Sequence, residues 1–263
     1  MLYFPQLLSG ATAQYPIQKR SIKRTIVNQT PGGRVVKFSD SGAAYQEWQL
    51  AYHDLDDSDV AVFQQFIMAC EGQLNGFTFL DPTGNLLAWS GAMEQPVWEA
   101  SSLLQITSTG IDDPLGGLAA ARITNPTGLD LAIQQTINAA GWFTYCFSVY
   151  VRGQVGLSIT VSLTTGTALV NRAYVAQTDW NRITLRGKLT TTAETITAGL
   201  TIPAGQSVEV FGPQLEAQPS ASPYKQTFSE SGVYPNVHLR EDIFSFTTTG
   251  TNRHNCTLNV TTR

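Results

Sequence analysis

The chain has 263 residues, of which 42% are hydrophobic and only 14% are charged, and its formal net charge is −4 at pH 7. This length is sufficient for one large or two ordinary domains with buried cores. Because nucleic-acid binding needs a clustered excess of Lys and Arg, the weakly acidic balance gives no expectation of a nucleic-acid partner. No run approaches the ~20 apolar residues of a membrane-spanning helix, and the N-terminus lacks the basic flank of a secretory signal.

The composition favours β-structure. Thr, Gly, Ser, Gln and Asn take the place of charged residues and are accompanied by Val and Ile. Thr, Val and Ile suit a pleated, half-buried surface, and Gly and Asn suit the turns between strands. We therefore expect an all-β protein with one helix, made of a small β-barrel or split-barrel domain and an inserted β-sandwich of the jelly-roll type.

The first hundred residues are predicted to form strands around one helix. The segment Tyr45–Tyr52 alternates and places Trp48, Leu50 and Tyr52 on one face, which is typical of a half-buried strand. Further strands are predicted at Gly33–Ser39, after a Pro-Gly-Gly turn, and at Phe77–Leu80. Two basic pairs, Lys19-Arg20 and Lys23-Arg24, are interpreted as a solvated strand edge that blocks unwanted pairing rather than as a phosphate site.

A helix is predicted at about residues 59–71. Val60, Phe63, Ile67 and Cys70 recur at helical spacing, and Gly72 follows as a stop. The acidic run at residues 54–59 lies just before this helix and resembles a calcium loop, but the Gly and Glu that such a loop requires are missing. We interpret the run as N-terminal capping, because acidic side chains satisfy free helix N–H groups and suit the positive helix end.

The middle of the chain, residues 96–226, is predicted to be a separate sandwich. In Thr144–Arg152, Phe147, Val149 and Val151 lie on one face, as in a strand with one buried side. Eight short strands in two sheets make a jelly roll, which leaves few exposed edges. The expected strands are Leu103–Thr107, Ala120–Thr124, Leu129–Gln135, Thr144–Arg152, Leu157–Leu163, Arg182–Leu189, Thr195–Ile202 and Ser207–Phe211.

The C-terminus returns to a strand pattern. Phe244 and Phe246 alternate, and Cys256, Leu258 and Val260 alternate after a turn at Gly250-Thr251-Asn252. A hairpin of this size is too small to be stable alone, so we expect it to complete the N-terminal sheet. Residues 1–95 and 227–263 would then form one domain, into which the sandwich is inserted.

The sequence contains no pattern of catalytic or metal-binding residues. No nucleophile elbow, phosphate-cradling loop or metal-type spacing is present, and no spacing brings two carboxylates together as glycoside hydrolysis requires. We therefore predict a protein that is not an enzyme and has no cofactor. The three histidines (His53, His238, His254) and three cysteines (Cys70, Cys146, Cys256) are scattered, and the cysteines suggest neither ligand pairs nor disulfides, as in a reducing cytoplasm.

Several motifs in the outer segments resemble the N-terminal barrel of distal tail proteins of long-tailed phages. They are Trp48-Gln49-Leu50, Phe63-Gln64-Gln65-Phe66, Cys70-Glu71-Gly72 and Phe77-Thr78-Phe79-Leu80-Asp81-Pro82, with Asp242–Thr248 and Cys256–Thr261 as closing strands. The resemblance implies a ring of six copies that joins the tail tube protein to the baseplate hub. It also implies a place at the tail tip of a virion assembled in the host cytoplasm. Many members carry their accessory domain after the barrel, whereas here it is nested within it.

A second set of motifs resembles the carbohydrate-binding-type jelly rolls of many phage tail proteins. It comprises Phe147-Ser148-Val149-Tyr150-Val151, Trp180, Phe211-Gly212-Pro213-Gln214-Leu215-Glu216 and Ser222-Pro223-Tyr224. Trp142 and Tyr174 lie at strand ends or turns, where their rings are candidates for stacking on a sugar. Trp180 is the third candidate, although it matches the buried tryptophan of the resembling family. Such jelly rolls often hold a structural calcium ion, but no acidic cluster marks a site here.

Three functions are therefore considered. The leading interpretation is an assembly protein that forms the tail-tip ring through contacts between copies. The second is a module that binds a polysaccharide of the host surface, and it is compatible with the first because a ring of weak sites gains avidity. The third is a hydrolase of the same polysaccharide, which requires a carboxylate pair in a cleft.

Overall fold

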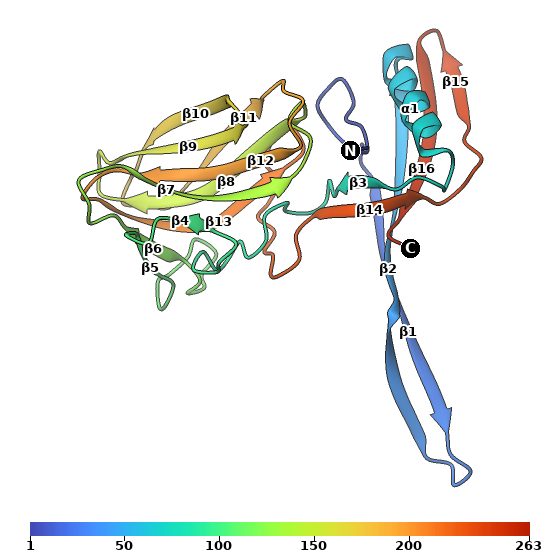
Figure 1. The fold of residues 1–263 in the computed structure, drawn as a ribbon, viewed down its shortest axis with the longest axis horizontal. Coiled ribbons are helices and arrows are strands. Elements are labelled where there is room, and N and C mark those ends of the chain that lie inside the picture. Colours follow the sequence, from blue (N-terminus) through green and yellow to red (C-terminus); the bar gives the residue numbers. More distant parts are fainter. The chain divides into compact units, whose positions relative to one another are not determined.

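The computed structural model describes residues 1–263 and contains one helix among strands, as the sequence predicts. The chain divides into two compact units (Figure 1). The sheet unit comprises residues 1–8, 13–79 and 234–263, and the sandwich unit comprises residues 9–12 and 80–233. The boundaries expected from the sequence, at 95/96 and 226/227, both fall inside the sandwich unit.

The sheet unit is built on one antiparallel sheet with the strand order β1-β2-β16-β14-β3, and β15 pairs with β16. β16 pairs with β2 along Glu47–Leu55, so the C-terminal hairpin completes the sheet of the N-terminal segment. The strands are β1 (Ile17–Gln29), β2 (Val35–Leu55), β3 (Phe77–Leu80), β14 (Val233–Leu239), β15 (Phe246–Gly250) and β16 (Arg253–Thr261).

The core of the sheet unit lies between the sheet and the helix α1 (Asp57–Cys70). Phe63 and Phe66 of α1 are buried, and the ring of Phe4 lies between them and the sheet, with its centroid 5.2 Å from that of Phe66. On the sheet side Trp48 and Tyr52 are fully buried. The predicted helix and the predicted buried face of the second strand are therefore both confirmed.

The sandwich unit consists of two five-stranded sheets. Gly187 of β11 lies against Leu163 of β9 and Val170 of β10, so the sheets face each other closely. One sheet has the order β10 (Ala168–Val175), β9 (Ser158–Thr165), β12 (Thr195–Ile202), β7 (Leu131–Asn138) and β4 (Glu99–Ala100). The other has the order β11 (Asn181–Lys188), β8 (Thr144–Gly153), β13 (Ser207–Glu216), β6 (Ala121–Thr124) and β5 (Gln105–Thr107).

Asn85 explains why the sandwich unit begins before residue 96. Its buried side chain donates to the carbonyl of Pro213 at 3.0 Å and accepts from the amides of Leu87 and Leu215 at 3.1 and 3.0 Å. These bonds tie the segment after β3 to β13. No composition shift marks this link, because it joins residues that are 128 positions apart.

Three strands were not predicted, namely β4, β10 and β14. β10 is an edge strand with mostly exposed side chains, including Asn171 and Arg172 at its centre, so it lacks a hydrophobic alternation. β14 contains Pro235 and Asn236 and buries only Val237 and Leu239. β4 has two residues, both exposed.

Candidate functional site

The sheet unit carries a projecting hairpin, which we call the arm and define as residues 22–45. β1 and β2 pair along this whole length, apart from a bulge between Ile22 and Arg24. β16 pairs with β2 only from Glu47 onwards, so the arm has no third strand. Strands rise about 3.3 Å per residue, and the arm therefore extends roughly 35 Å beyond the three-stranded part of the sheet. Figure 1 shows it in blue, directed away from α1.

Apolar side chains are exposed on both faces of the arm. Ile26 is paired with Phe38, so these two share one face, whereas Val27 and Val35 lie on the other. Ile26, Phe38, Val27 and Val35 are 39%, 53%, 57% and 50% exposed. Burying each half-exposed side chain against a partner is worth about 1 kcal/mol. Such a hairpin is marginally stable by itself, so these side chains favour contact with another surface.

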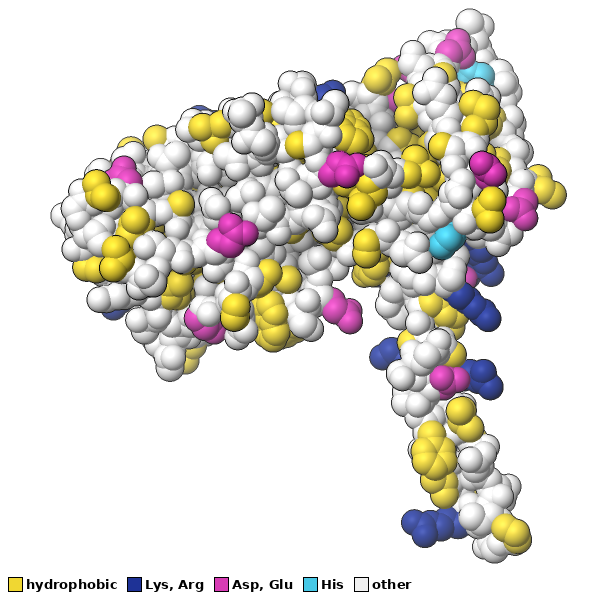
Figure 2. Space-filling view, in the orientation of Figure 1, with side chains coloured by type: hydrophobic (Ala, Val, Ile, Leu, Met, Phe, Trp, Pro, Cys, Tyr) yellow, Lys and Arg dark blue, Asp and Glu magenta, His cyan; other side chains and the backbone are white.

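The arm is also basic. It holds four basic residues (Lys23, Arg24, Arg34, Lys37) and one acidic residue, Asp40. Arg24 and Asp40 are paired at 3.6 Å, whereas Lys23, Arg34 and Lys37 form no ion pair within the chain. Figure 2 shows basic and hydrophobic side chains next to one another along the arm. Because the whole chain carries a net charge of −4, this concentration of positive charge is local.

The root of the arm is fixed to the core. The ammonium group of Lys19 lies 5.2 Å from the ring centroid of Trp48 and 5.6 Å from that of Tyr234. At the other side the guanidinium of Arg263 lies 5.4 Å from the ring centroid of Tyr45. These cation–π contacts and the burial of Trp48 hold the direction in which the arm leaves the sheet.

The sandwich unit has a second candidate surface on the outer face of the β11-β8-β13-β6-β5 sheet. Arg152 donates through both terminal nitrogens to Asp112 at 2.8 and 2.7 Å and also binds Glu209, which accepts a further bond from Arg122. The guanidinium of Arg152 lies 4.6 Å from the ring centroid of Trp180. Beside these residues is an open hollow of about 340 Å³, the Arg152 groove, lined by Arg122, Arg152, Gly153, Thr178, Ser207, Val208 and Glu209.

The ion pairs of this groove keep its carboxylates and guanidinium groups charged at neutral pH. Burial raises the pKa of Glu209, but hydrogen bonds from Arg122 and Arg152 outweigh that effect, so the pKa lies below its ordinary value. The hydrogen bond from Arg152 lowers the pKa of Asp112 and at the same time raises the pKa of Arg152. Both carboxylates are therefore ionised, and neither is available as a proton donor at neutral pH.

Next to the groove, aromatic rings pack on one another across the same sheet face. The ring centroid of Phe211 lies 5.0 Å from that of Tyr224 and 6.0 Å from that of Tyr150, and Trp180 packs against this cluster. Gly212 has a φ of +59°, and a Cβ at this position would meet the ring of Tyr224 at 3.0 Å. The aromatic residues of this motif therefore form a small satellite core, which covers part of the sheet face.

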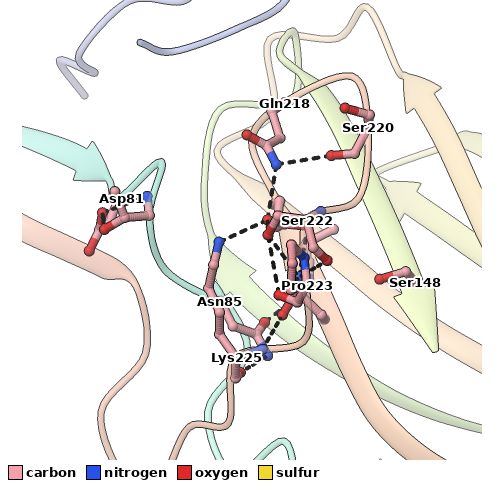
Figure 3. A network of polar contacts seen from close by, with 12 residues as sticks. Asp81, Asn85, Ser148, Gln218, Ser220, Ser222, Pro223 and Lys225 are labelled. Carbon is pink, nitrogen blue, oxygen red and sulfur yellow. Dashed lines mark hydrogen bonds and ion pairs between the residues drawn. The ribbon is translucent and has the colours of Figure 1, made fainter. Parts of the chain in front are cut away.

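The carboxylate of Glu216, which is 2% exposed, holds the exit segment of the sandwich against β13. Figure 3 shows Gln218, Ser222 and Lys225 from this network. Gln214 and Gln218 donate to it at 2.8 and 3.0 Å, the backbone amide of Ser222 donates at 3.0 Å, and the ammonium of Lys225 lies at 3.2 Å. We call this set the Glu216 clamp. It gives the Gln214-Leu215-Glu216 and Ser222-Pro223-Tyr224 motifs a structural role in closing the sandwich.

The three residues predicted to stack on sugar stand at three separate places. Trp142 is 39% exposed in the turn between β7 and β8, with its ring centroid 5.9 Å from that of Phe143. Tyr174 lies on β10, and its hydroxyl donates to the carbonyl of Thr184 on β11. Trp180 is half-buried in the aromatic cluster beside the Arg152 groove. The groove residues were not predicted, because their charges come from four distant segments.

The acidic run before α1 is divided among several contacts. Asp56 is the N-cap and accepts from the amide of Asp59 at 2.8 Å, which confirms the predicted capping. The other carboxylates also have partners outside the helix, namely Arg253 for Asp54, His254 for Asp57 and the amide of Leu8 for Asp59. The structure contains no group of three or more His, Cys, Asp or Glu side chains placed to hold a metal ion.

The three cysteines are buried and free. Burial raises the pKa of Cys70 and Cys256 to about 12 and that of Cys146 to about 11. At neutral pH they are therefore protonated thiols of low reactivity. No helix of the structure has the length and hydropathy needed to cross a membrane.

Solved structures of other proteins resemble about half of this chain. No protein-family model and no curated protein sequence matches it. Among solved structures, a family 61 carbohydrate-binding module in complex with β-1,4-galactotriose is 16% identical, with a TM-score of 0.38, over 50% of this chain and 97% of that chain. The CBM22-1 xylan-binding domain of Xyn10C from Paenibacillus barcinonensis is 15% identical, with a TM-score of 0.42, over 52% of this chain and 96% of that chain.

A phage protein is also similar. The enzymatically active domain of tailspike protein 4 of bacteriophage CBA120 is 11% identical, with a TM-score of 0.42, over 52% of this chain but only 22% of that chain. At this level of identity and coverage, these likenesses establish neither a ligand nor an activity for the chain.

Proposed function

We propose that this chain is a structural protein of a phage tail tip, which associates with copies of itself into a ring through the arm. The observation that carries the proposal is the arm itself, a two-stranded hairpin with exposed apolar side chains and unpaired basic ones. A two-stranded hairpin is marginally stable by itself, so a partner that covers the arm would stabilise it. β1 is also an edge strand of its sheet, a position at which a strand of another copy can pair.

The partner is a second copy of the chain. Copies of one protein that meet through two different surfaces form a closed ring when the rotation between them closes. The resemblance of the outer segments to distal tail proteins supplies the finer part of the proposal. It comprises a ring of six copies, a position between the tail tube protein and the baseplate hub, and assembly in the host cytoplasm.

The mass of the purified chain in solution tests this function. We expect light scattering at low salt to give a mass that rises with concentration toward a closed oligomer. Added salt should lower that mass at fixed concentration, because screening weakens the attraction of the basic arm for an acidic surface. A monomer at all concentrations and salt levels would overturn the proposal for the isolated chain.

A second candidate function is binding of a host-surface polysaccharide by the sandwich unit. The observation that favours it is the Arg152 groove, an open hollow of about 340 Å³ with Arg122, Arg152 and Glu209 in its wall. Small-ligand sites have volumes of about 300–1,000 Å³ and a few fixed polar groups, and this groove meets both conditions. The proposed ligand is a neutral or acidic glycan held by hydrogen bonds.

A glycan array tests this candidate. We expect binding by the intact chain and a loss of about tenfold or more in the Arg122→Ala variant, which removes a groove donor. Trp142→Ala and Tyr174→Ala serve as controls, because both residues lie outside the groove lining. Binding that depends on Trp142 or Tyr174 but not on Arg122 would place the sugar elsewhere.

A further inference from the structure

The sheet unit has an exposed apolar and acidic surface at the C-terminal end of α1. We call it the α1 patch and define it by Met68, Glu71, Leu74, Asp242 and Ile243. Met68, Leu74 and Ile243 are 68%, 70% and 88% exposed. Large apolar side chains that gather on the surface mark contact sites more often than single ones do.

Hydrogen bonds hold the two segments of the α1 patch together. The backbone amide and the side-chain amide of Gln73 both donate to the carboxylate of Asp242, each at 3.0 Å. Gly72 lies against the same carboxylate, and its φ of +69° suits the turn after the helix. The segment that follows α1 and the segment that follows β14 therefore lie against each other, with Leu74 next to Gln73 and Ile243 next to Asp242 in the sequence.

The α1 patch is also electronegative. The last turn of α1 contains no basic residue, so the partial negative charge of the helix C-terminus is not compensated there. Glu71 is the C-cap and is exposed, and Asp242 adds a second carboxylate whose partner is the uncharged Gln73. A surface with these features attracts Lys and Arg side chains.

The arm and the α1 patch are complementary in chemistry. The arm offers Ile26 and Phe38 beside the unpaired Lys23, Arg34 and Lys37, whereas the patch offers three exposed apolar side chains beside two carboxylates. The arm does not reach the patch of its own chain, because it continues the direction of β2 away from α1 (Figure 1).

We propose that the arm of one copy docks on the α1 patch of a second copy. This inference rests on the proposed ring function and names the receiving surface. The arm and the patch are different surfaces, so the contact can be repeated from copy to copy, and it produces a ring when the rotation between successive copies closes. Apolar contact supplies the attraction, and the pairing of basic with acidic groups fixes the orientation.

A charge-reversal experiment tests the docking. The arm variant Lys23→Glu/Arg34→Glu/Lys37→Glu is expected to weaken self-association about tenfold or more, because like charges then face each other. The matched control is Arg172→Glu/Arg186→Glu/Lys188→Glu on the sandwich unit, which makes the same change in net charge and should leave association unchanged. The patch variant Glu71→Lys/Asp242→Lys should weaken association like the arm variant, and a mixture of the arm and patch variants should regain at least part of it.

The patch variant removes the hydrogen bonds that Asp242 accepts from Gln73, so a second readout that keeps Asp242 is needed. Disulfide trapping provides it. The Phe38→Cys and Leu74→Cys variants, mixed under mild oxidation, should form a covalent heterodimer that neither variant forms alone. The native thiols are buried and have raised pKa values, so they do not compete. A pair of Phe38→Cys with Val155→Cys, an exposed sandwich position, is the control.

The outcomes separate the inference from the proposed function. In one outcome the intact chain associates, the arm variant weakens this association, and the patch variant and the disulfide trapping show no effect. The α1 patch is then not the surface that receives the arm, and the ring function stands. If the intact chain never associates, both fail. Weakening by both reversals, recovery in the mixture and a specific heterodimer support the docking.

Discussion

A chain whose arm is shortened stays a monomer at concentrations where the intact chain associates. The change replaces residues 23–44 by Asn-Gly, a dipeptide that closes a two-residue hairpin between Ile22 and Tyr45. Self-association is lost because the exposed apolar side chains and unpaired basic groups of the arm are removed together. Light scattering of both proteins measures the effect.

Stability provides the control for this change. The removed side chains are outside the core of the sheet unit, so the free energy of unfolding should change by less than about 1 kcal/mol. A milder variant, Ile26→Ser/Phe38→Ser, keeps the hairpin and its charges and should weaken association to an intermediate degree. An arm-shortened chain that is folded and still forms the full oligomer would show that the arm is not the interface.

The Glu216→Ala variant should lose about 1–3 kcal/mol of unfolding free energy in the sandwich unit. Removing the buried carboxylate leaves the backbone amide of Ser222 without its acceptor, and an unsatisfied buried donor has this order of cost. The ammonium of Lys225 is 30% exposed, and the amides of Gln214 and Gln218 keep other acceptors, so these groups add less. Denaturant unfolding followed by tryptophan fluorescence measures the change, since four of the five tryptophans (Trp89, Trp98, Trp142, Trp180) lie in the sandwich unit.

Two variants calibrate this measurement. Glu216→Gln keeps an acceptor oxygen and should lose less than Glu216→Ala. Asp179→Ala makes the same change in net charge at an exposed position and should stay within about 0.5 kcal/mol of the intact chain. If Glu216→Ala were as stable as Asp179→Ala, the clamp would not hold the exit segment.

The elements that the sequence predicts best are those with one buried face. The helix has regular hydrophobic spacing because one side of it lies in a core. In the strand at Thr144–Arg152, the alternating residues Phe147, Val149 and Val151 lie in the core, although the first half of the strand is buried on both faces. The sequence also predicts that the C-terminal hairpin joins the N-terminal sheet, because a hairpin of this size is not stable alone. The pairing of β16 with β2 confirms this prediction. In each case the pattern that is visible in the sequence is produced by burial.

The sequence predicts the arm only in part, for the same physical reason. The strand expected at Gly33–Ser39 corresponds to the start of β2, but no pattern indicates its pairing with β1, because neither face of the arm is buried within the chain. The sequence indicates a strand edge at the basic pair at the root, Lys19-Arg20, and at the pair within the arm, Lys23-Arg24, and β1 is an edge strand of its sheet. The full extent of the hairpin depends on the pairing of β1 with β2, which appears only in the structure.

The candidate site of the sandwich was harder to predict than its strands. Arg152, Asp112, Glu209 and Arg122 come from four segments whose register decides which side chains meet. A one-residue change of register would turn these groups to the opposite face, so sequence spacing alone does not identify them. Aromatic residues such as Trp142 and Tyr174 were visible in the sequence, but their positions relative to a groove were not.

Hydrogen exchange of the arm backbone tests the central claim most directly. Amide exchange is compared between a dilute sample, in which the chain is dissociated, and a concentrated sample, in which it is associated. If copies meet through the arm, the amides of residues 24–40 exchange about tenfold or more slowly in the associated form, whereas those of β9 are unchanged. If the mass rises with concentration while the arm amides exchange at the same rate in both samples, the arm is free in the assembly and the account is wrong.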